Sequence, residues 1–436
     1  MTTIHKYLAV LLLGCALSIQ MAHAVTNVVL PGESIQVQIN LSGDGDTVAI
    51  FGGTYSEDLV ITQAVRLAEV SGQDVIINGS VLISGVINPP PLEGFAIGSS
   101  GRGLTISNTP GILLNSLDLR TGSGLAAKGS SDVRIQNSQI SAVSAGSASI
   151  ELTGTRIVGD LHQTTGRLYT VDCNIGGSIY ATNSAGTSVV FRTVITNLAQ
   201  LRGSLSIVAY SRAKTIWCSG NTGATIRIVG CLVNETQRLN VDAVSLGGTS
   251  NNILVANCQM YNYDTYNIAI GPTLQGVVIN NYVAGGNNTS GIYNYGIDSS
   301  STGVKIINNI VVSKLNGIKA PFGSIVKGCC VYSVANRYIG GVVPTEDINA
   351  NPLFNQSTHI LEPGSPCIDG GSTDARYRDR DGSRADVGPT GGAWYDPAGW
   401  TSDVPVAVSF DLSTDQYLEG TLAEVVLSGG SAVSVP

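Results

Sequence analysis

A pattern of three short apolar strands recurs along the chain and constrains its fold more than any other feature. Clear copies begin at Tyr266, Tyr295 and Asn316 and read YNIAIGPTLQGVVINNYV, YGIDSSSTGVKIINNIVV and NGIKAPFGSIVKGCCVYS. Each copy has an apolar-x-apolar strand, a turn, a second alternating strand ending at Asn or Gly, and a third apolar strand. No helical period accompanies the pattern, so short strands are the expected elements.

Weaker copies of this pattern lie upstream and begin at Phe95, Leu125 and Asp242. Across all copies the second strand recurs after about 22 residues, whereas a propeller blade needs about 40. The predicted first residues of these second strands are Leu104, Val133, Ile150, Leu168, Val189, Leu205, Ile226, Ile253, Gly276, Val304 and Ser324.

Stacking is the way in which such units can bury an apolar face. Alternation directs one side chain inward and the next outward, and coils pair in parallel about 4.8 Å apart. The composition fits this arrangement, with 43% apolar residues for a core, 53 Gly for turns and 12% charged residues. The sequence therefore predicts an all-β fold, a parallel β-helix of three-strand coils over residues 25–345.

The first 24 residues predict export. The apolar run Tyr7–Leu17 is too short to span a bilayer, and the small residues of Ala22–Ala24 fit a cleavage site. A lipoprotein-type site at Leu12–Cys15, with lipidation of Cys15, is the alternative. We expect a signal peptide over residues 1–24, no transmembrane segment, and a secreted or cell-surface protein. The net charge of −8 argues against nucleic acid as a partner.

The repeats resemble right-handed parallel β-helix proteins of the pectin-lyase-like superfamily. GDTVAIFGGTYSEDLVI, from Gly45 to Ile61, is similar to the entry segment that many of them share, and the resemblance extends over about Ser34 to Val343. It implies the right-handed form of the fold. It does not specify an activity, because this fold carries enzymes, adhesins and phage spikes.

The segment after the repeats resembles the C-terminal region called choice-of-anchor Q. It reads DINANPLFNQSTHILEPGSPCIDGG, then DRDGSRADVG, and departs from the family at Pro389–Gly392. The matching stretches are Asn351–Phe354, Gly364–Asp369, Asp381–Gly382 and Asp386–Gly388.

We expect residues 346–392 to cap the open apolar end of the β-helix, since the last coil exposes unpaired edges. Phe354, Ile360, Leu361 and Ile368 are the residues expected to point inward.

Residues 393–436 form a strand-like tail in this prediction. Val404–Leu412 reads VPVAVSFDL and alternates over nine residues, and LAEVVL and AVSVP follow. The tail is interpreted as an appendage, an attachment tail or a strand for self-association with a neighbour's open edge.

Lyases of this superfamily bind calcium with acids on stacked first strands and use Arg or Lys as the base. The resemblance makes Asp264 the first such acid, with Asp242 as a second candidate ligand, but Ile268 stands where the next acid belongs. Two acids are few for a cation that takes six to eight oxygens. No cofactor is expected, with calcium as the alternative.

Alternation places Ser245, Ala269, Asp298 and Lys319 on the outward face of successive first strands. Asp264, Asp298 and Lys319 are candidate catalytic residues. Asp298 with Lys319 is alternatively a surface ion pair worth about 0–1 kcal/mol. A hydrolase would need two suitably spaced carboxylates, which the sparse acids of the repeats do not indicate.

The stretch DRDGSRAD also permits a calcium loop through Asp379, Asp381 and Asp386. Tyr377 and Gly388 stand where such a loop needs acids. A turn held by Asp–Arg pairs is the preferred interpretation.

Tyrosines cluster late in the repeats and suggest carbohydrate binding. The tyrosine ring can stack on a sugar ring, and its hydroxyl can hydrogen-bond to the sugar hydroxyls. The alternative is packing at coil ends. If they bind sugar, we expect one exposed patch. The candidates are Tyr261, Tyr263, Tyr266, Tyr282, Tyr293 and Tyr295.

Seven cysteines remain after the predicted cleavage, an odd number. Four lie five residues after a predicted strand start, so they should form one interior line. We expect Cys231 and Cys258 to be stacked and reduced, since parallel side chains suit a packed ladder better than a disulfide. The four aligned residues are Cys173, Cys231, Cys258 and Cys329.

Two functional classes follow. The first is a non-catalytic scaffold or adhesin that binds a polysaccharide or cell-surface glycan. The second is an extracellular polysaccharide lyase or hydrolase. A filament subunit is a further alternative.

Overall fold

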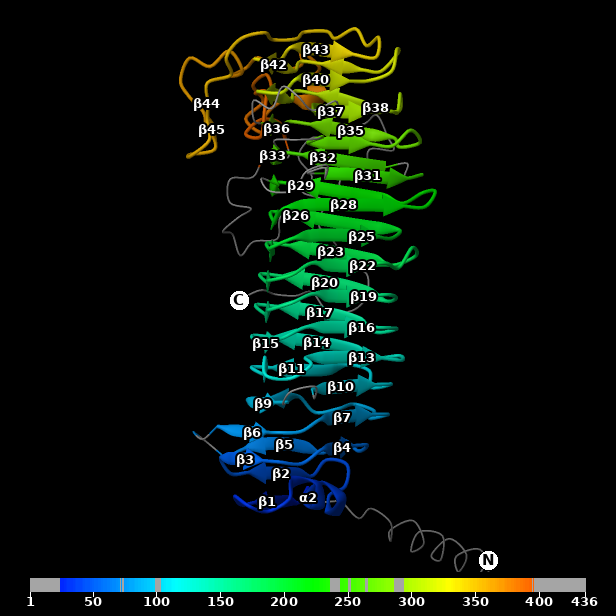
Figure 1. Ribbon diagram of the computed structural model, residues 1–436, viewed down its shortest axis with the longest axis vertical. Coiled ribbons are helices and arrows are strands. Elements are labelled where there is room, and N and C mark those ends of the chain that lie inside the picture. The colour runs from blue at the N-terminus through cyan, green and yellow to red at the C-terminus, as the bar shows by residue number, and fades with distance from the viewer. Residues whose placement is uncertain are drawn as a thin grey trace, which may run out of the picture.

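The computed structural model describes residues 24–70, 72, 74–98, 103–235, 244–249, 252–262, 266–285, 294–393 and 395. In this part of the chain, three long parallel sheets wrap around one apolar interior and form the column in Figure 1. Each coil passes from sheet I to sheet II to sheet III. The predicted all-β fold of parallel stacked coils is confirmed, and the protein is a β-solenoid.

The three sheets take their strands in chain order. Sheet I contains β4 (Leu59–Ile61), β7 (Val81–Ser84), β10 (Leu104–Ser107), β13 (Leu125–Lys128), β16 (Val143–Ala145), β19 (Leu161–Gln163), β22 (Ile179–Ala181), β25 (Leu198–Arg202), β28 (Thr215–Gly220), β31 (Val244–Gly248), β34 (Ile268–Ile270), β37 (Tyr295–Ser299), β40 (Asn316–Lys319) and β43 (Asn336–Ile339). Sheet II contains β8 (Leu92–Glu93), β11 (Ile112–Asn115), β14 (Asp132–Gln136), β17 (Ser149–Thr153), β20 (Arg167–Val171), β23 (Thr187–Phe191), β26 (Leu205–Ala209), β29 (Thr225–Val229), β32 (Asn252–Ala256), β35 (Gly276–Ile279), β38 (Val304–Ile307) and β41 (Val326–Lys327). Sheet III contains β3 (Gly53–Tyr55), β6 (Val75–Ile77), β9 (Phe95–Ile97), β12 (Asp118–Leu119), β15 (Gln139–Ile140), β18 (Arg156–Ile157), β21 (Asn174–Ile175), β24 (Val194–Ile195), β27 (Arg212–Ala213), β30 (Leu232–Glu235), β33 (Gln259–Asn262), β36 (Tyr282–Ala284), β39 (Ile310–Val312) and β42 (Cys330–Tyr332).

The first coils add a small sheet and a helix. The strands β1 (Thr26–Val29), β2 (Thr47–Ile50) and β5 (Arg66–Glu69) pair in parallel, and α2 (Ile35–Leu41) buries Ile35 and Ile39. No helix was expected here. It forms because the Ser34 side chain caps its N-terminus and the Glu57 carboxylate accepts the Ile35 N–H at 2.7 Å.

Coil length varies along the column. Leu125 pairs with Val143 and Val143 with Leu161, a step of 18 residues, whereas Ile216 pairs with Val244 after 28. The additional residues of this longer coil include those between β30 and β31, where sheet III passes to sheet I.

Seven of the eleven predicted second-strand starts lie in one register on strands of sheet II, Ser324 keeps this register two residues before β41, and three are wrong. Leu104 lies on sheet I, and Val189 and Leu205 are each displaced by one residue, because Leu168 pairs with Ser188. The outer face of sheet II is itself apolar at β23 and β26. Alternation there cannot tell the inward side from the outward side.

A two-residue turn joins sheet II to sheet III in most coils. Its first residue has positive φ, as in Asn137 (50°), Asn257 (53°) and Asn280 (53°), a conformation that Asn and Gly adopt most readily. The second residue points inward. This explains why the second strand of so many repeats ends at Asn or Gly.

The inward residues of these turns form what we call the corner ladder. Each backbone N–H donates to the side chain of the next coil: Cys231 N to Cys258 Sγ (3.4 Å), Cys258 N to Asn281 Oδ1 (3.0 Å) and Asn281 N to Asn309 Oδ1 (3.0 Å). The ladder satisfies buried N–H groups that the sheets leave unpaired. Its members include Ser138, Thr155, Cys173, Thr193, Ser211, Cys231, Cys258, Asn281, Asn309 and Cys329.

The predicted stacking of Cys231 on Cys258 is therefore confirmed, and Cys173 and Cys329 lie on the same ladder. Every cysteine in the described part of the chain is buried and free. Burial raises the pKa of Cys173 to about 11, which keeps this thiol protonated at neutral pH.

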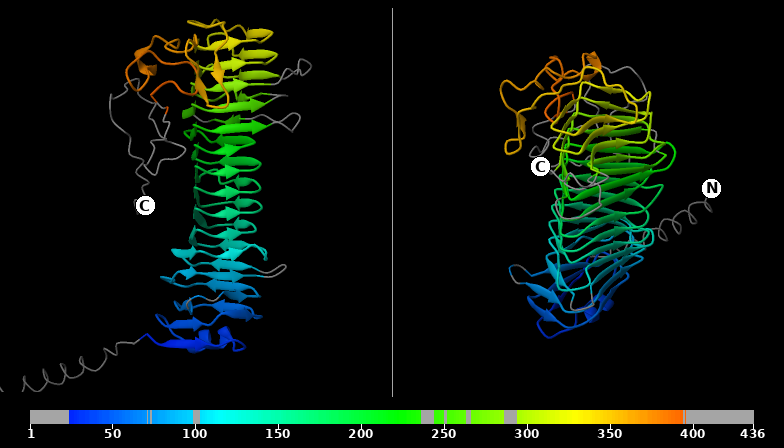
Figure 2. Two further views of the ribbon diagram at one scale, coloured as in Figure 1. Left: turned by 90° about the vertical axis from the view of Figure 1, so that its left-hand side faces the viewer. Right: turned by 45° about the horizontal axis from the view of Figure 1, so that its top comes forward.

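The C-terminal region, residues 346–393, lies along the flank of the last coils and not across the end of the column (Figures 1 and 2). Ile348 first extends sheet III, because its N–H donates to Cys329 O at 2.8 Å. Leu361 and Cys367 then pack with outward residues of β36, β39 and β42. The region includes β44 (Phe354–Asn355), β45 (Ile360–Leu361) and a 3₁₀ turn at Ala375–Tyr377.

The expectation that four apolar residues of this region point inward is wrong for two of them. Ile360 is 49% exposed and Ile368 is 41% exposed, whereas Leu361 is buried and Phe354 stacks on Tyr282 with ring centroids 4.2 Å apart. The region covers sheet III rather than the column's end, because the outer face of that sheet is apolar here.

Three turn asparagines hold the C-terminal region to successive coils. Asn308 Oδ1 accepts Ser372 N–H (2.7 Å), Asn280 Nδ2 donates to Asp386 O (2.8 Å), and Asn257 Nδ2 donates to Gly391 O (2.8 Å). These bonds satisfy backbone groups of a segment that lacks long strands of its own.

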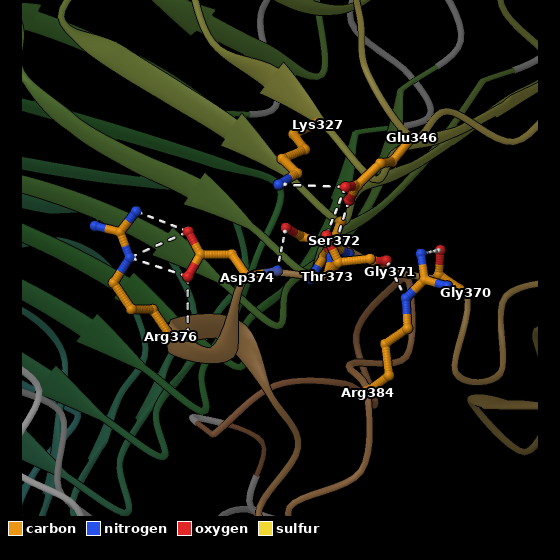
Figure 3. Close-up of polar contacts among 10 residues, drawn as sticks. Lys327, Glu346, Gly370, Gly371, Ser372, Thr373, Asp374, Arg376 and Arg384 are labelled. Atoms are coloured by element: carbon orange, nitrogen blue, oxygen red, sulfur yellow. Dashed lines mark hydrogen bonds and ion pairs between the residues drawn. The ribbon is translucent and has the colours of Figure 1, made fainter.

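Glu346 is the centre of a second attachment, shown in Figure 3. Its carboxylate lies 3.3 Å from Lys327 Nζ and accepts the Thr373 N–H (2.9 Å) and hydroxyl (2.6 Å). Burial raises the pKa of Glu346, but the bonds to Thr373 and Lys327 outweigh it and hold the pKa below its ordinary value. Nearby, Asp374 pairs with Arg376 at 2.7 Å.

Backbone hydrogen bonds hold the DRDGSRAD turn, and this corrects the expectation of Asp–Arg pairs. Asp379 accepts the N–H groups of Asp386 (3.0 Å) and Gly392, and Asp381 accepts that of Ser383 (2.9 Å). The arginines donate to carbonyls, as Arg384 Nε does to Gly371 (2.7 Å) in Figure 3.

Substituting Asn309→Ala should destabilise the column by about 2–4 kcal/mol. The change removes the acceptor of Asn281 N–H and the donor to Val278 O, and each orphaned buried group costs about 1–3 kcal/mol. Denaturant unfolding followed by circular dichroism measures the loss. Asn174→Ala, at an exposed position of β21, is the matched control and should shift the midpoint little. Equal shifts for both variants would contradict the structural role of the ladder.

Asp379 should make stability depend on pH. Burial raises its pKa from 3.8 to about 6, so the folded protein binds this proton more tightly than the unfolded chain. The resulting stability is complete below pH 3.8 and is lost as pH rises toward 6. Relative to wild type, Asp379→Asn should gain melting temperature between pH 4 and pH 6.5.

Asp381→Asn is the control, because hydrogen bonds from Ser383 lower the pKa of Asp381. Its contribution to the pH dependence of stability therefore lies below pH 3.8. A wild-type minus Asp379→Asn difference that stays constant from pH 4 to pH 6.5 would refute the assignment.

Candidate functional site

One outward line of side chains follows sheet I from coil to coil. Pairing places Ser245 beside Ala269, Ala269 beside Asp298 and Asp298 beside Lys319. The predicted outward positions of these four residues are therefore confirmed. Their strand neighbours, such as Ile268 and Ile297, are buried in the interior.

Asp298 and Lys319 form an ion pair on this face. Lys319 Nζ lies 3.1 Å from Asp298 Oδ2, with the Asp298 side chain 10% exposed and that of Lys319 39% exposed. The other carboxylate oxygen, Oδ1, is buried and has no hydrogen-bond partner within the described residues. A buried carboxylate oxygen without a donor is costly, and the same burial closes this atom to a ligand.

Two tyrosines lie beside this ion pair. Tyr266 and Tyr295 stack with ring centroids 5.5 Å apart and an interplanar angle of 15°, and both are half-buried. Lys319 Nζ lies 5.3 Å from the Tyr295 ring centroid, within range of a cation–π contact. We call this group of residues the upper site: Tyr266, Tyr295, Asp298 and Lys319.

The tyrosines do not form the single exposed patch that was expected. Tyr261 and Tyr282 lie on sheet III, whereas Tyr295 begins β37 of sheet I and Tyr266 lies two residues before β34. Tyr282 is 3% exposed, because Phe354 covers its ring and Gln356 Nε2 donates to its hydroxyl at 3.0 Å. Burial raises the pKa of Tyr282.

Four further candidates lie outside the described residues: Asp242, Tyr263, Asp264 and Tyr293. They belong to the segments that connect sheet III to sheet I in three consecutive coils, next to the upper site in sequence. The described residues contain no group of three His, Cys, Asp or Glu side chains placed to hold a metal ion. Ile268, which replaces the second acid of the calcium pattern, points into the core.

The outward line continues downward as an aromatic run that sequence reasoning missed. His162 stacks on Tyr180 with centroids 4.7 Å apart, and Tyr180 leads through Gln200 to Trp217 by strand pairing. The Arg202 guanidinium lies 4.9 Å from the Trp217 ring centroid. These residues are far apart in sequence but share one repeat position. Aligning the repeats would have predicted this run.

No protein-family model matches the chain, and no curated protein matches it. Among solved structures, it is similar to a PL6 alginate lyase in complex with a trisaccharide, at 12% identity and a TM-score of 0.22. The match covers 75% of this chain and 85% of the lyase. A likeness at this level carries no argument about activity, and the resemblance to choice-of-anchor Q stays a prediction. No helix in the described ranges has the length and apolar character to span a membrane.

Lys319→Met should destabilise the protein more than Asp298→Asn. Removing Lys319 leaves a buried carboxylate unpaired, whereas removing the charge of Asp298 leaves a more exposed ammonium that water can solvate. We expect a loss of about 1–3 kcal/mol for Lys319→Met, reduced from the value for fully buried pairs by solvent screening. Thermal unfolding ranks the two variants and the double variant, which should recover part of the loss. The reverse ranking would contradict the burial of Asp298.

Proposed function

We propose that this chain is an exported, non-catalytic β-solenoid that binds a polysaccharide or cell-surface glycan along the outer face of sheet I. One observation carries the proposal. The stacked rings of Tyr266 and Tyr295 adjoin the Asp298–Lys319 ion pair, in which the Lys319 side chain is 39% exposed. The apolar first 24 residues support export.

The upper site offers both kinds of contact that sugars use. A tyrosine face stacks on the apolar face of a pyranose ring, and the partly exposed Lys319 ammonium can donate to a sugar hydroxyl or carboxylate. Lys319 and Asp298 are bound to each other, so the carboxylate fixes the position of the ammonium on this face. The aromatic run from His162 to Trp217 extends the same face for a long chain.

Tyr295→Ala should weaken glycan binding by about tenfold, since a stacked aromatic contact contributes about 0.5–1.5 kcal/mol beyond its buried area. Affinity electrophoresis of the mature protein against alginate, pectate and neutral glycans measures the effect. Tyr169→Ala, on the outer face of sheet II, is the matched control and should bind like wild type.

The same samples test the alternative function. Appearance of the absorbance band of unsaturated uronates, with or without calcium, would show a lyase and overturn the non-catalytic proposal. Unchanged binding in Tyr295→Ala would overturn the assigned site.

A further inference from the structure

The outer face of sheet II carries a band of apolar side chains. Strand pairing aligns Val189 with Ile207, and Leu254 with Val277, on one outward line. We call this set the apolar band. Its residues are Val189, Phe191, Leu205, Ile207, Ala209, Val229, Leu254, Ala256, Val277, Ile279 and Ile307.

The band has clear limits along the column. Below Val189 the same outward line is occupied by Tyr169, Glu151 and Arg134, and above Val277 it is occupied by Lys305. If this face contacted only water, polar side chains would be expected on the strands β23 to β38 as well. A contiguous apolar surface of this kind marks a contact with another segment or molecule.

The lower band is buried although it points away from the core. Ile207 is 3% exposed, Ala209 0% and Val229 1%. Tyr377 is the C-terminal residue that belongs to this cluster in the described part of the chain. It comes from a segment attached to higher coils, so it does not account for contact along the whole band.

One cation lies within the band. Arg227 aligns with Ile207 on one side and Leu254 on the other, and it is 1% exposed. Its guanidinium donates to Asn252 O at 2.7 Å. A second cation, Arg192, lies 4.8 Å from the Phe191 ring centroid at the edge of the band and is paired with Asp172 at 2.6 Å.

The C-terminal chain descends toward this surface. Its contacts pass from Asn308 to Asn280 to Asn257, one coil at a time in the direction of the N-terminus. Tyr395 follows, with its carbonyl accepting from Arg380 Nη1 at 3.3 Å. The chain therefore reaches the turn after β32, at the side of the band, and residues 396–436 follow.

We propose that residues 396–436 fold back onto the lower apolar band, with Val404–Leu412 laid against β23, β26 and β29. This segment alternates, so that Val404, Val406, Val408, Phe410 and Leu412 share one face. Residues 396–436 as a whole contain six Asp and Glu residues and no Lys or Arg, so they bring no like charge to the surface that holds Arg227.

The contact is face to face. The strands of sheet II in the band already have a hydrogen-bonded neighbour on each side, so an added segment packs on their side chains and not on their edges. In this proposal the tail docks on the β-solenoid of its own chain and does not pair with a neighbouring molecule.

A photocrosslinking amino acid at Val189 in the full chain tests the proposal. We expect an intramolecular crosslink into the 401–436 peptide, identified by mass spectrometry. Arg134, three coils below on the same outward line and exposed, is the control position and should give none. A crosslinked dimer, or a crosslink elsewhere in the chain, would overturn the proposal, as would no crosslink to the tail.

A pair of tail variants separates docking from general damage. Val406→Asp with Val408→Asp should abolish the crosslink and increase binding of an apolar fluorescent dye, while circular dichroism stays unchanged. Ala407→Asp with Ser409→Asp alters the opposite face and should leave the crosslink intact. The same loss in both pairs would refute the proposed face.

Discussion

Hydrogen bonds between successive coils, made at a buried corner as well as in the sheets, fix the register on which every other feature depends. In the corner ladder, a backbone N–H of one coil donates to the side chain of the next, as Asn281 N does to Asn309 Oδ1. A slip of one residue would orphan these groups in the interior and turn every core side chain outward. Because the register is fixed, outward residues also align, and the lines of side chains on sheets I and II follow from it.

The sequence alone was sufficient for features that depend on alternation and repeat phase. It predicted the stacked coils, the outward line from Ser245 to Lys319 and the stacking of Cys231 on Cys258. Alternation failed where both faces of a strand are apolar, as at Val189. It also gave no sign of α2, whose alternating apolar residues resemble a strand until Ser34 and Glu57 cap them.

Only part of the candidate site could be predicted from the sequence, for a related reason. Asp298 and Lys319 were found because they are neighbours in phase, but whether an outward residue is exposed depends on what lies over it. Tyr282 is outward and buried, because a segment distant in sequence covers it. Tyr180 and Trp217 lie on the same line as the site, and local clustering of tyrosines did not point to them.

Solenoids contact only their nearest neighbours along the axis, so their ends are where unravelling begins. The last coils differ, because one C-terminal segment links three of them directly. It is hydrogen-bonded to Asn257, Asn280 and Asn308. None of these coils can peel away until the segment releases all of them together. The C-terminal end of the array therefore frays as one cooperative block, which slows the first step of unravelling from that end.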